Sequence, residues 1–198
     1  MKDKIKKIQN KIGVEADGIV GVKTVAALMV ALGIPDEERR VTVWPSQREV
    51  RSGKSIFGSP GGGQLVKVMP PYPLYYEGRA VECISVHKAI AEHVEAALRE
   101  VLQVYGAARI KELGLDQYGG CYNYRQTTGG STLSMHAWGI ALDFCPDKNA
   151  YKMKAPAASL SAEACRPWWE IWEKHGAVSM GRTYDKDWMH LQFARFND

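Results

Sequence analysis

Residues 134–144 read SMHAWGIALDF, a stretch that combines the pattern of a β-strand with two polar side chains. Residues 139–144 alternate, so that Ala141 and Asp143 would share one face of a strand. A small residue beside a carboxylate leaves open space next to the charge. A buried carboxylate needs a strong partner, such as an arginine or a metal ion. The same stretch carries His136, and only glycine and small or apolar residues separate it from the aspartate.

A second stretch, residues 185–193 (DKDWMHLQF), supplies further partners for Asp143. Its alternation places His190 on the open face of a strand, and Asp187 stands three residues earlier. Together with His136, this gives two histidines and a carboxylate that can converge on one ion. Two nitrogens and one oxygen, with a fourth position left to water, form the ligand set of a catalytic zinc site, whereas structural zinc is more often closed by four ligands rich in cysteine.

Other residues compete for these roles. Cys145 lies two residues after Asp143 on the same face and is the one rival ligand. Residues 81–105 are expected to form one long helix, on which Cys83 and His87 stand one turn apart as a possible metal pair. A hydrogen-bonded core histidine is the commoner case. Composition alone would favour ordinary hydrogen bonding for every one of these side chains.

Size and composition limit the possible functions. The 198 residues allow one domain or a domain with an appendage, and 45% hydrophobic content is ordinary for a globular protein. The net charge of +4 is too weak and dispersed to indicate nucleic-acid binding, and no apolar run approaches a membrane span. The N-terminus lacks the apolar core of a signal peptide, so Sec export is not expected. The four cysteines show no C-x-x-C spacing and are expected to be reduced.

Residues 1–36 are expected to form a short helical unit. Isoleucines recur at helical spacing before Gly13, which predicts a first helix ending there. After an Asp-Gly turn, a second helix is expected over residues 22–32. The pair could simply pack on the rest of the protein, because so short a piece rarely folds unaided.

The stretch IQNKIGVEADGIVGVKTVAAL, however, resembles the peptidoglycan-binding module of bacterial and phage wall hydrolases. The pattern of that module is Q-x-x-L-G-x-x-x-D-G-x-x-G-x-x-T-x-x-A-L. The matching residues are Gln9, Gly13, Asp17, Gly18, Gly21, Thr24, Ala27 and Leu28. The family module normally adds a third helix, whereas this chain continues into the polar segment PDEERR. The resemblance implies that the unit binds bacterial peptidoglycan.

The motif S-x-H-x-x-G-x-A-x-D, followed by D-x-x-H, closely resembles the zinc peptidases that cut bacterial wall peptides. That group includes D-Ala-D-Ala carboxypeptidases and dipeptidases and the L-alanyl-D-glutamate endopeptidases of phage endolysins. The motif residues are Ser134, His136, Gly139, Ala141, Asp143, Asp187 and His190. The likeness extends from the WPSQ stretch at residue 44 to the C-terminus. Before the second motif the family often has a Gly-Gly pair, where this chain has SMGR.

The resemblance implies an α+β fold of the hedgehog and D-Ala-D-Ala metallopeptidase type, with a small antiparallel sheet and packed helices. It implies that Zn²⁺ is held by His136, Asp143 and His190, and that zinc-bound water is the nucleophile. Asp187 would then be the general base, since it is tied to the metal site without having to bind the metal.

Two further residues are implicated near the cleft. The resemblance implies that Arg125 reaches the cleft, where a second positive charge would stabilise an oxyanion; a surface position on a glycine-rich loop is the alternative. Ser134 could bind the substrate backbone or could cap a turn. Trp138 and Trp188, each close to a ligand, are either cleft walls or core residues.

The sequence therefore predicts three parts. Residues 1–36 form the module, residues 37–64 a connecting segment that lies on the catalytic domain, and residues 65–198 the zinc peptidase domain. Trp44 and Phe57 indicate that the connecting segment is ordered. Within the last part the expected elements are a strand over 65–68, the helix over 81–105 and a shorter helix ending at Gly114.

Three functions compete on these grounds. The first is an endolysin-type endopeptidase that cuts L-Ala-D-Glu in the wall stem peptide. The second is a carboxypeptidase of the same fold that removes a terminal D-amino acid. The third, a non-catalytic wall-binding protein, is disfavoured because Asp187 is present. The expected partner is peptidoglycan and the expected state a monomer, made in the host cytoplasm and released to the wall by another protein.

Overall fold

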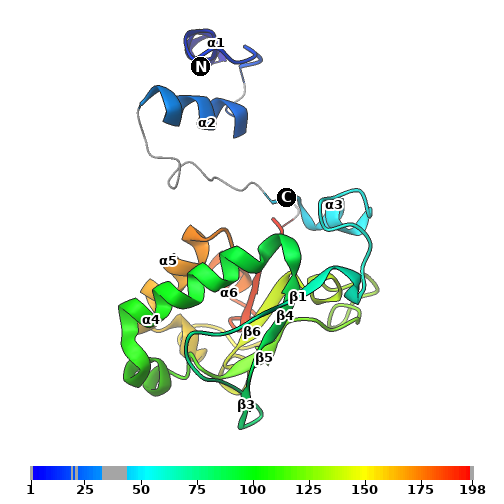
Figure 1. The fold of residues 1–198 in the computed structure, drawn as a ribbon, viewed down its shortest axis with the longest axis vertical. Coiled ribbons are helices and arrows are strands. Elements are labelled where there is room, and N and C mark those ends of the chain that lie inside the picture. Colours follow the sequence, from blue (N-terminus) through cyan, green and yellow to red (C-terminus); the bar gives the residue numbers. More distant parts are fainter. Residues whose placement is uncertain (1, 19, 21, 33–43, 197–198) are drawn as a thin grey trace. The chain divides into compact units, whose positions relative to one another are not determined.

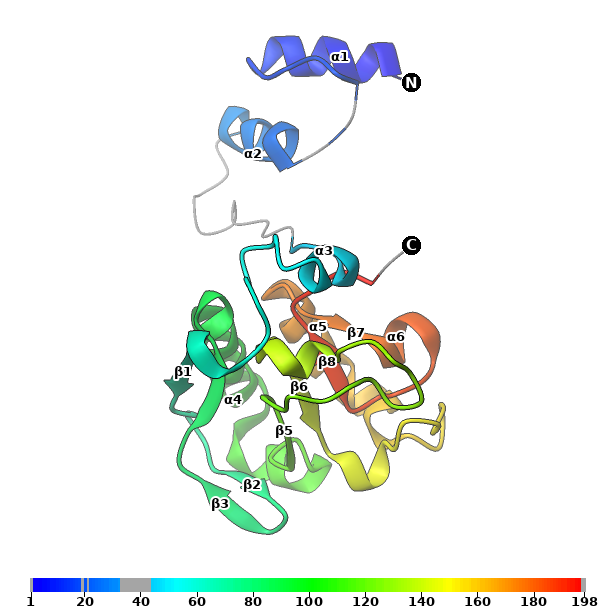
Figure 2. The same cartoon turned by 90° about the vertical axis from the view of Figure 1, so that its right-hand side faces the viewer.

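The chain divides into two compact units, Met1–Val43 and Trp44–Asp198, which are described separately. The computed structural model describes residues 2–18, 20, 22–32 and 44–196 (Figures 1 and 2). The predicted boundary at residue 36 lies outside these residues, and residues 44–64 belong to the second unit. Within the described part, no helix has both the length and the apolar character that crossing a membrane would require.

The first unit contains the two expected helices, α1 (Lys2–Lys11) and α2 (Val22–Ala31). Gly13 and Gly18 both have positive φ and shape the connection between them. The buried side chain of α1 is Gln9, whereas Ile8 on the predicted apolar face is 45% exposed. The predicted isoleucine face is thus only partly buried, with Ile5 and Ile12 half-buried, and the fully buried side chain of the helix is polar.

The Gln9 side chain connects three parts of the first unit. Its amide nitrogen donates to Asp17 Oδ1 (2.6 Å) and to Thr24 Oγ1 (3.1 Å), and its amide oxygen accepts from Gly18 N (2.8 Å). These residues belong to the peptidoglycan-module pattern, so its polar positions form one hydrogen-bond network here. Gly21, another position of the pattern, lies outside the described residues.

The second unit is built on a four-stranded antiparallel sheet with the order β5-β6-β8-β7. Its strands are β5 (Tyr118–Gly120), β6 (Ala141–Phe144), β8 (His190–Gln192) and β7 (Val178–Ser179). Two smaller antiparallel pairs are β1 (Leu65–Val68) with β4 (Ile84–His87), and β2 (Leu74–Tyr76) with β3 (Arg79–Val81). The predicted strand over residues 65–68 is confirmed.

The prediction of a single helix over residues 81–105 is wrong in its first part. Val81 ends β3, residues 84–87 form β4, and the helix α4 begins only at Ala91 (Ala91–Leu113). In β4, Ile84 and Val86 are buried and pair with β1. Apolar residues in such a short segment satisfy both a helical and a strand period, and pairing across the sheet decides between them.

Helices cover one face of the main sheet. Trp168 and Trp172 of α5 (Arg166–Lys174) contact the ring of Phe144 in β6, and α4 packs against α5 (Figure 1). Helix α4 contains a break at Gly106 and ends at Leu113, with Gly114 as its left-handed cap, which agrees with the predicted helix end at Gly114. The apolar side of β6 thus faces α5, which leaves Ala141 and Asp143 on the opposite side of the strand.

Two short helices complete the unit, α3 (Gln47–Arg51) and α6 (Met180–Tyr184). Ser46 and Glu49 form a capping box at the start of α3. Trp44 and Phe57, on either side of α3, are buried and stack on each other with 5.6 Å between ring centroids. The predicted α+β class, with a small antiparallel sheet and packed helices, is confirmed.

Candidate active site

The register of the main sheet brings two of the motif residues together. Asp143 on β6 lies directly opposite His190 on β8. Its Oδ1 lies 3.1 Å from His190 Nδ1, and both side chains are buried. Strand residues that face each other in an antiparallel pair have adjacent side chains, so this contact follows from the pairing itself.

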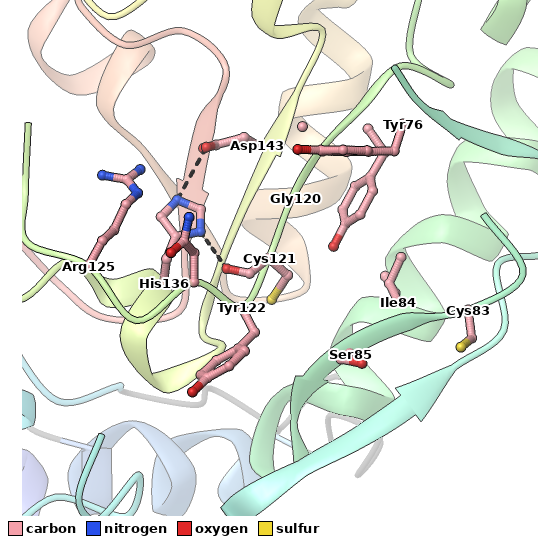
Figure 3. Close-up of a pocket in the computed structure, with 13 residues that line it drawn as sticks. Tyr76, Cys83, Ile84, Ser85, Gly120, Cys121, Tyr122, Arg125, His136 and Asp143 are labelled. Carbon is pink, nitrogen blue, oxygen red and sulfur yellow. Dashed lines mark hydrogen bonds and ion pairs between the residues drawn. The ribbon is translucent and has the colours of Figure 1, made fainter. Parts of the chain in front are cut away.

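His136 reaches the same place from a 3-10 turn, Met135–Trp138, that immediately precedes β6. Its Nε2 lies 3.3 Å from Asp143 Oδ2 (Figure 3). The same nitrogen lies 3.3 Å from His190 Nδ1. The turn ends at Gly139, which has φ 68°. A Cβ atom at this glycine would overlap the end of the Leu65 side chain and lie 3.2 Å from the backbone nitrogen of His87, so a larger residue would have to displace Leu65 and adopt a strained φ.

Hydrogen bonds on the outer side of each ring fix the orientation of the two histidines. His136 Nδ1 lies 2.6 Å from the carbonyl oxygen of Cys121, and His190 Nε2 lies 3.1 Å from Gln192 Oε1. Because these oxygens only accept, both outer nitrogens carry the proton. The inner nitrogens, His136 Nε2 and His190 Nδ1, then present lone pairs to each other and to the Asp143 carboxylate.

Such a cluster of acceptors requires positive charge at its centre. The three inner ligand groups lie within 4.8 Å of one another. Protons on the inner histidine nitrogens can supply this charge in place of an ion: burial would raise the pKa of Asp143, but the charge and hydrogen bonds of the two rings then outweigh it and hold that pKa well below its usual range. Two imidazole nitrogens, whose rings are oriented by outer hydrogen bonds, and a carboxylate oxygen fit a zinc ion with a fourth position left open.

Asp187 lies in a tight turn next to this cluster. Its φ is 52°, its backbone nitrogen donates to Tyr151 O (3.1 Å), and its carbonyl accepts from His190 N (3.0 Å). The side chain is 8% exposed, and its Oδ1 is buried without a hydrogen-bond partner among the described residues. Burial raises the pKa of Asp187 against the opposing effect of His190, with a further rise from Asp143. A raised pKa makes this carboxylate a better proton acceptor than an ordinary exposed aspartate.

Two cavities flank the cluster, and Arg125 lines both of them. The larger, about 380 Å³, includes His136 and Asp143 in its lining and is shown in Figure 3. The smaller, about 130 Å³, includes Asp187 and His190. Arg125 is half-buried and donates from Nη1 to the carbonyl of its neighbour Gln126 (3.2 Å). It therefore lies at the edge between the cavities, beside His136.

The remaining residues near the site have structural contacts. Ser134 caps the 3-10 turn by accepting from His136 N (3.4 Å), and it also lines the smaller cavity. Trp138 is buried and donates to Gly58 O (2.9 Å). Trp188 is nearly buried and packs so closely on Gly181 that a side chain there would clash with its ring. Both tryptophans are thus core residues, and Gly181 of the SMGR stretch is required by packing.

The rival ligands lie elsewhere. Cys145 follows β6 with φ 50°, and its sulfur lies 3.7 Å from Ser159 Oγ, outside the cluster. The structure favours the commoner case for His87, a buried and hydrogen-bonded histidine, over a metal pair with Cys83, because β4 is extended and four residues along a strand span about 13 Å. His87 instead accepts from Ala89 N through Nδ1 (3.1 Å).

The sequence did not identify the outer partners of the histidines. Gln192 was recognisable in principle, because alternation along β8 places it on the same face as His190. The carbonyl of Cys121 carries no side-chain signal. Gln47, which donates to Gln192 Oε1 (3.0 Å), comes from α3, 145 residues away in the chain. Only the folded structure brings these groups together.

Residues 128–193 match the family model described as D-alanyl-D-alanine carboxypeptidase, of the M15 peptidase type. The matched region covers about a third of the chain and contains Ser134, the three clustered residues and Asp187. Arg125 lies just before it. Together with the His-Asp-His cluster, the match supports assignment to the zinc peptidase superfamily. No curated protein and no solved structure matched the chain.

Proposed function

We propose that the protein is a zinc-dependent peptidoglycan peptidase that hydrolyses an amide bond of the wall stem peptide, with L-Ala-D-Glu as the preferred bond. The observation that carries this proposal is the convergence of His136, Asp143 and His190 beside a buried carboxylate with an unpartnered oxygen, Asp187. The family match adds the chemical class, since its description names a peptidase of D-alanyl peptides.

Each residue has a distinct role in this proposal. His136, Asp143 and His190 would hold the zinc ion, which when bound supplies Lewis acidity toward water and the scissile carbonyl. Asp187 accepts a proton from the attacking water and passes it to the departing amine. Arg125, which lines both cavities, donates hydrogen bonds to the oxyanion that forms on the substrate carbonyl.

The two cavities give the substrate a direction. Asp187 lines the smaller cavity, so the amine that receives its proton leaves on that side. The acyl part of the substrate then occupies the larger cavity, whose lining includes Tyr76, Tyr118 and Tyr122. Ser134, which also lines the smaller cavity, has a hydroxyl available to the substrate backbone in addition to its capping role.

A D-Ala-D-Ala carboxypeptidase activity is the alternative within the same chemistry, and the description of the matched family favours it. A non-catalytic wall-binding protein is a third candidate from another class. It would not need a buried, unpartnered carboxylate next to the histidine cluster, because leaving a buried polar group unsatisfied costs stability.

We further propose that the first unit binds peptidoglycan, on the basis of its motif, whose polar residues the Gln9 network holds together in the fold. The protein would act on the wall as a monomer, released to it in the manner of phage endolysins. Deleting residues 1–34 should weaken binding to intact sacculi and spare cleavage of soluble muropeptides. Equal loss on both substrates, together with a lower melting temperature, would make this unit part of the structure of the peptidase.

One digestion experiment tests the proposed function. Purified stem-peptide muropeptides are incubated with the zinc-loaded protein, and the products are weighed by mass spectrometry, with a chelator-treated sample as control. A product with a new glutamate amino terminus identifies the endopeptidase. Loss of a single terminal alanine identifies the carboxypeptidase. If the zinc-loaded sample cleaves neither bond, the peptidase function is wrong and the non-catalytic wall-binding function is favoured.

A further inference from the structure

The smaller cavity carries more positive charge than the chemistry already assigned to it requires. Its lining includes two arginines, Arg51 and Arg125, and one carboxylate, Asp187. Arg125 has a role at the oxyanion. Arg51 has none, and it lies in α3, far outside the region that matches the peptidase family.

The guanidinium of Arg51 is held in place by hydrogen bonds that occupy only some of its N–H groups. Its Nε donates to the carbonyl of Leu133 (2.9 Å) and its Nη1 to Gln47 Oε1 (3.2 Å). A guanidinium has five N–H groups, so three remain for another acceptor. In the part of the chain that the structure describes, no carboxylate forms an ion pair with Arg51. The side chain is half-buried, and burial lowers its pKa, so this cation has lost hydration without gaining a counter-ion.

Helix α3 fixes Arg51 relative to the site. Val50 is fully buried, Gln47 N donates to Arg195 O (2.9 Å), and the capping box orders the first turn. Gln47 also donates to Gln192 Oε1, which accepts from His190. A continuous chain of hydrogen bonds therefore runs from Arg51 to the histidine cluster, so the guanidinium is preorganised and a partner would lose little entropy on binding it.

Both candidate substrates carry a carboxylate at the position this geometry requires. In the L-Ala-D-Glu bond the glutamate continues the stem through its side chain, so its α-carboxylate is free on the residue whose nitrogen departs. In a D-Ala-D-Ala bond the departing residue carries the free C-terminal carboxylate. The two substrates thus share one feature, an α-carboxylate on the leaving residue, which the proposed direction of binding places in the smaller cavity.

We propose that Arg51 binds the α-carboxylate of the residue that leaves on the amine side of the scissile bond. This rests on the proposed peptidase function and makes Arg51 a specificity-determining residue. Planar guanidinium and carboxylate groups pair through two parallel hydrogen bonds, and such pairing discriminates strongly against a neutral amide.

The test compares matched substrate pairs. One pair is a stem peptide containing L-Ala-D-Glu with either a free or an amidated α-carboxyl group. The other is a peptide ending in D-Ala-D-Ala with either a free or an amidated C-terminus. The zinc-loaded wild type should cut the carboxylate form of its substrate with a kcat/KM about 10- to 100-fold above that of the amide form. Arg51→Gln should abolish this difference by slowing the carboxylate form alone.

Two further variants separate recognition from structure. Arg51→Lys keeps the charge but loses the bidentate geometry, and it should retain part of the preference. Arg48→Gln, in the same helix but exposed and outside the cavity lining, should leave the preference and the rates unchanged. Melting temperatures and zinc content of all variants report whether the fold and the metal site are intact.

The outcomes distinguish this inference from the proposed function. A wild type that cuts both forms of a pair equally well, or an Arg51→Gln variant that slows both forms equally, overturns the role of Arg51 and leaves the peptidase intact. A zinc-loaded wild type that cuts none of the four substrates overturns the peptidase and the inference together.

Discussion

Each unit of this protein contains a buried polar cluster, and the two clusters differ in how their hydrogen bonds are satisfied. In the first unit, Gln9 donates through its amide nitrogen and accepts through its amide oxygen, so donors and acceptors are matched. In the second unit, the inner atoms of His136, Asp143 and His190 are all acceptors once the outer hydrogen bonds are made.

This difference separates a structural network from a binding site. A matched network is complete within the chain and stabilises the fold without any external partner. A cluster of inward-facing acceptors is incomplete and requires a cation. The same comparison applies to the two buried aspartates of the second unit. Positive charge on the inner histidine nitrogens, when they take up protons in place of a metal ion, lowers the pKa of Asp143, whereas burial raises the pKa of Asp187.

Removing a histidine from the acceptor cluster should have the largest effect. His136→Ala or His190→Ala should lose both zinc and activity, because two ligand groups hold the ion too weakly. Metal analysis after dialysis and a muropeptide hydrolysis assay measure the two quantities. Chelation of the wild type should abolish activity, and added zinc should restore it. A dialysed, metal-free variant that hydrolyses wall peptides at the wild-type rate would disprove the site.

The two aspartates should respond differently to the same change. Asp187→Asn removes a proton acceptor and should lower kcat by on the order of 10²–10⁴ with zinc content near that of the wild type. Asp143→Asn removes an anionic ligand and should weaken zinc retention as well as rate. One metal assay and one rate assay on each variant suffice. Loss of zinc from Asp187→Asn with retention in Asp143→Asn would reverse the assigned roles.

Sequence alone predicted the part of the site that follows from strand periodicity and local motifs. The alternation around Asp143 and His190 indicated that their side chains share a face, and the antiparallel register places them opposite each other. Periodicity failed at residues 81–90, where pairing with β1 overrides a helical spacing. It also gave no indication of Gln47 or Arg51, because their positions depend on how α3 packs onto the sheet.

The outer partner of His190 should have a smaller effect than the ligands. Gln192→Met keeps the size of the side chain but removes the oxygen that accepts from His190 Nε2. The ring then loses its fixed orientation, and zinc affinity should fall by about 10- to 100-fold. Competition with a chromogenic chelator measures the affinity. Gln47→Met removes only the hydrogen bond from Gln47 to Gln192 and should lower the zinc affinity less. If both variants bound zinc as tightly as the wild type, the hydrogen bond on the outer side of His190 would have no effect on zinc affinity.

The smallest effect on chemistry should come from the matched network of the first unit. Gln9→Leu removes the buried amide, leaving Gly18 N without the oxygen that it donates to. The free energy of unfolding of this unit should fall by about 1–3 kcal/mol, the usual cost of breaking a buried hydrogen bond on one side. Hydrogen exchange of the amides in α1 and α2 should accelerate accordingly. Zinc content and hydrolysis of soluble muropeptides should stay at wild-type values, because all the clustered ligands belong to the second unit.

Asn10→Leu, at the exposed neighbour of Gln9 on the same helix, is the matched control and should leave hydrogen exchange unchanged. If Gln9→Leu left exchange at the wild-type rate, the network would not stabilise the unit, and if it lowered zinc content, the two clusters would not be independent.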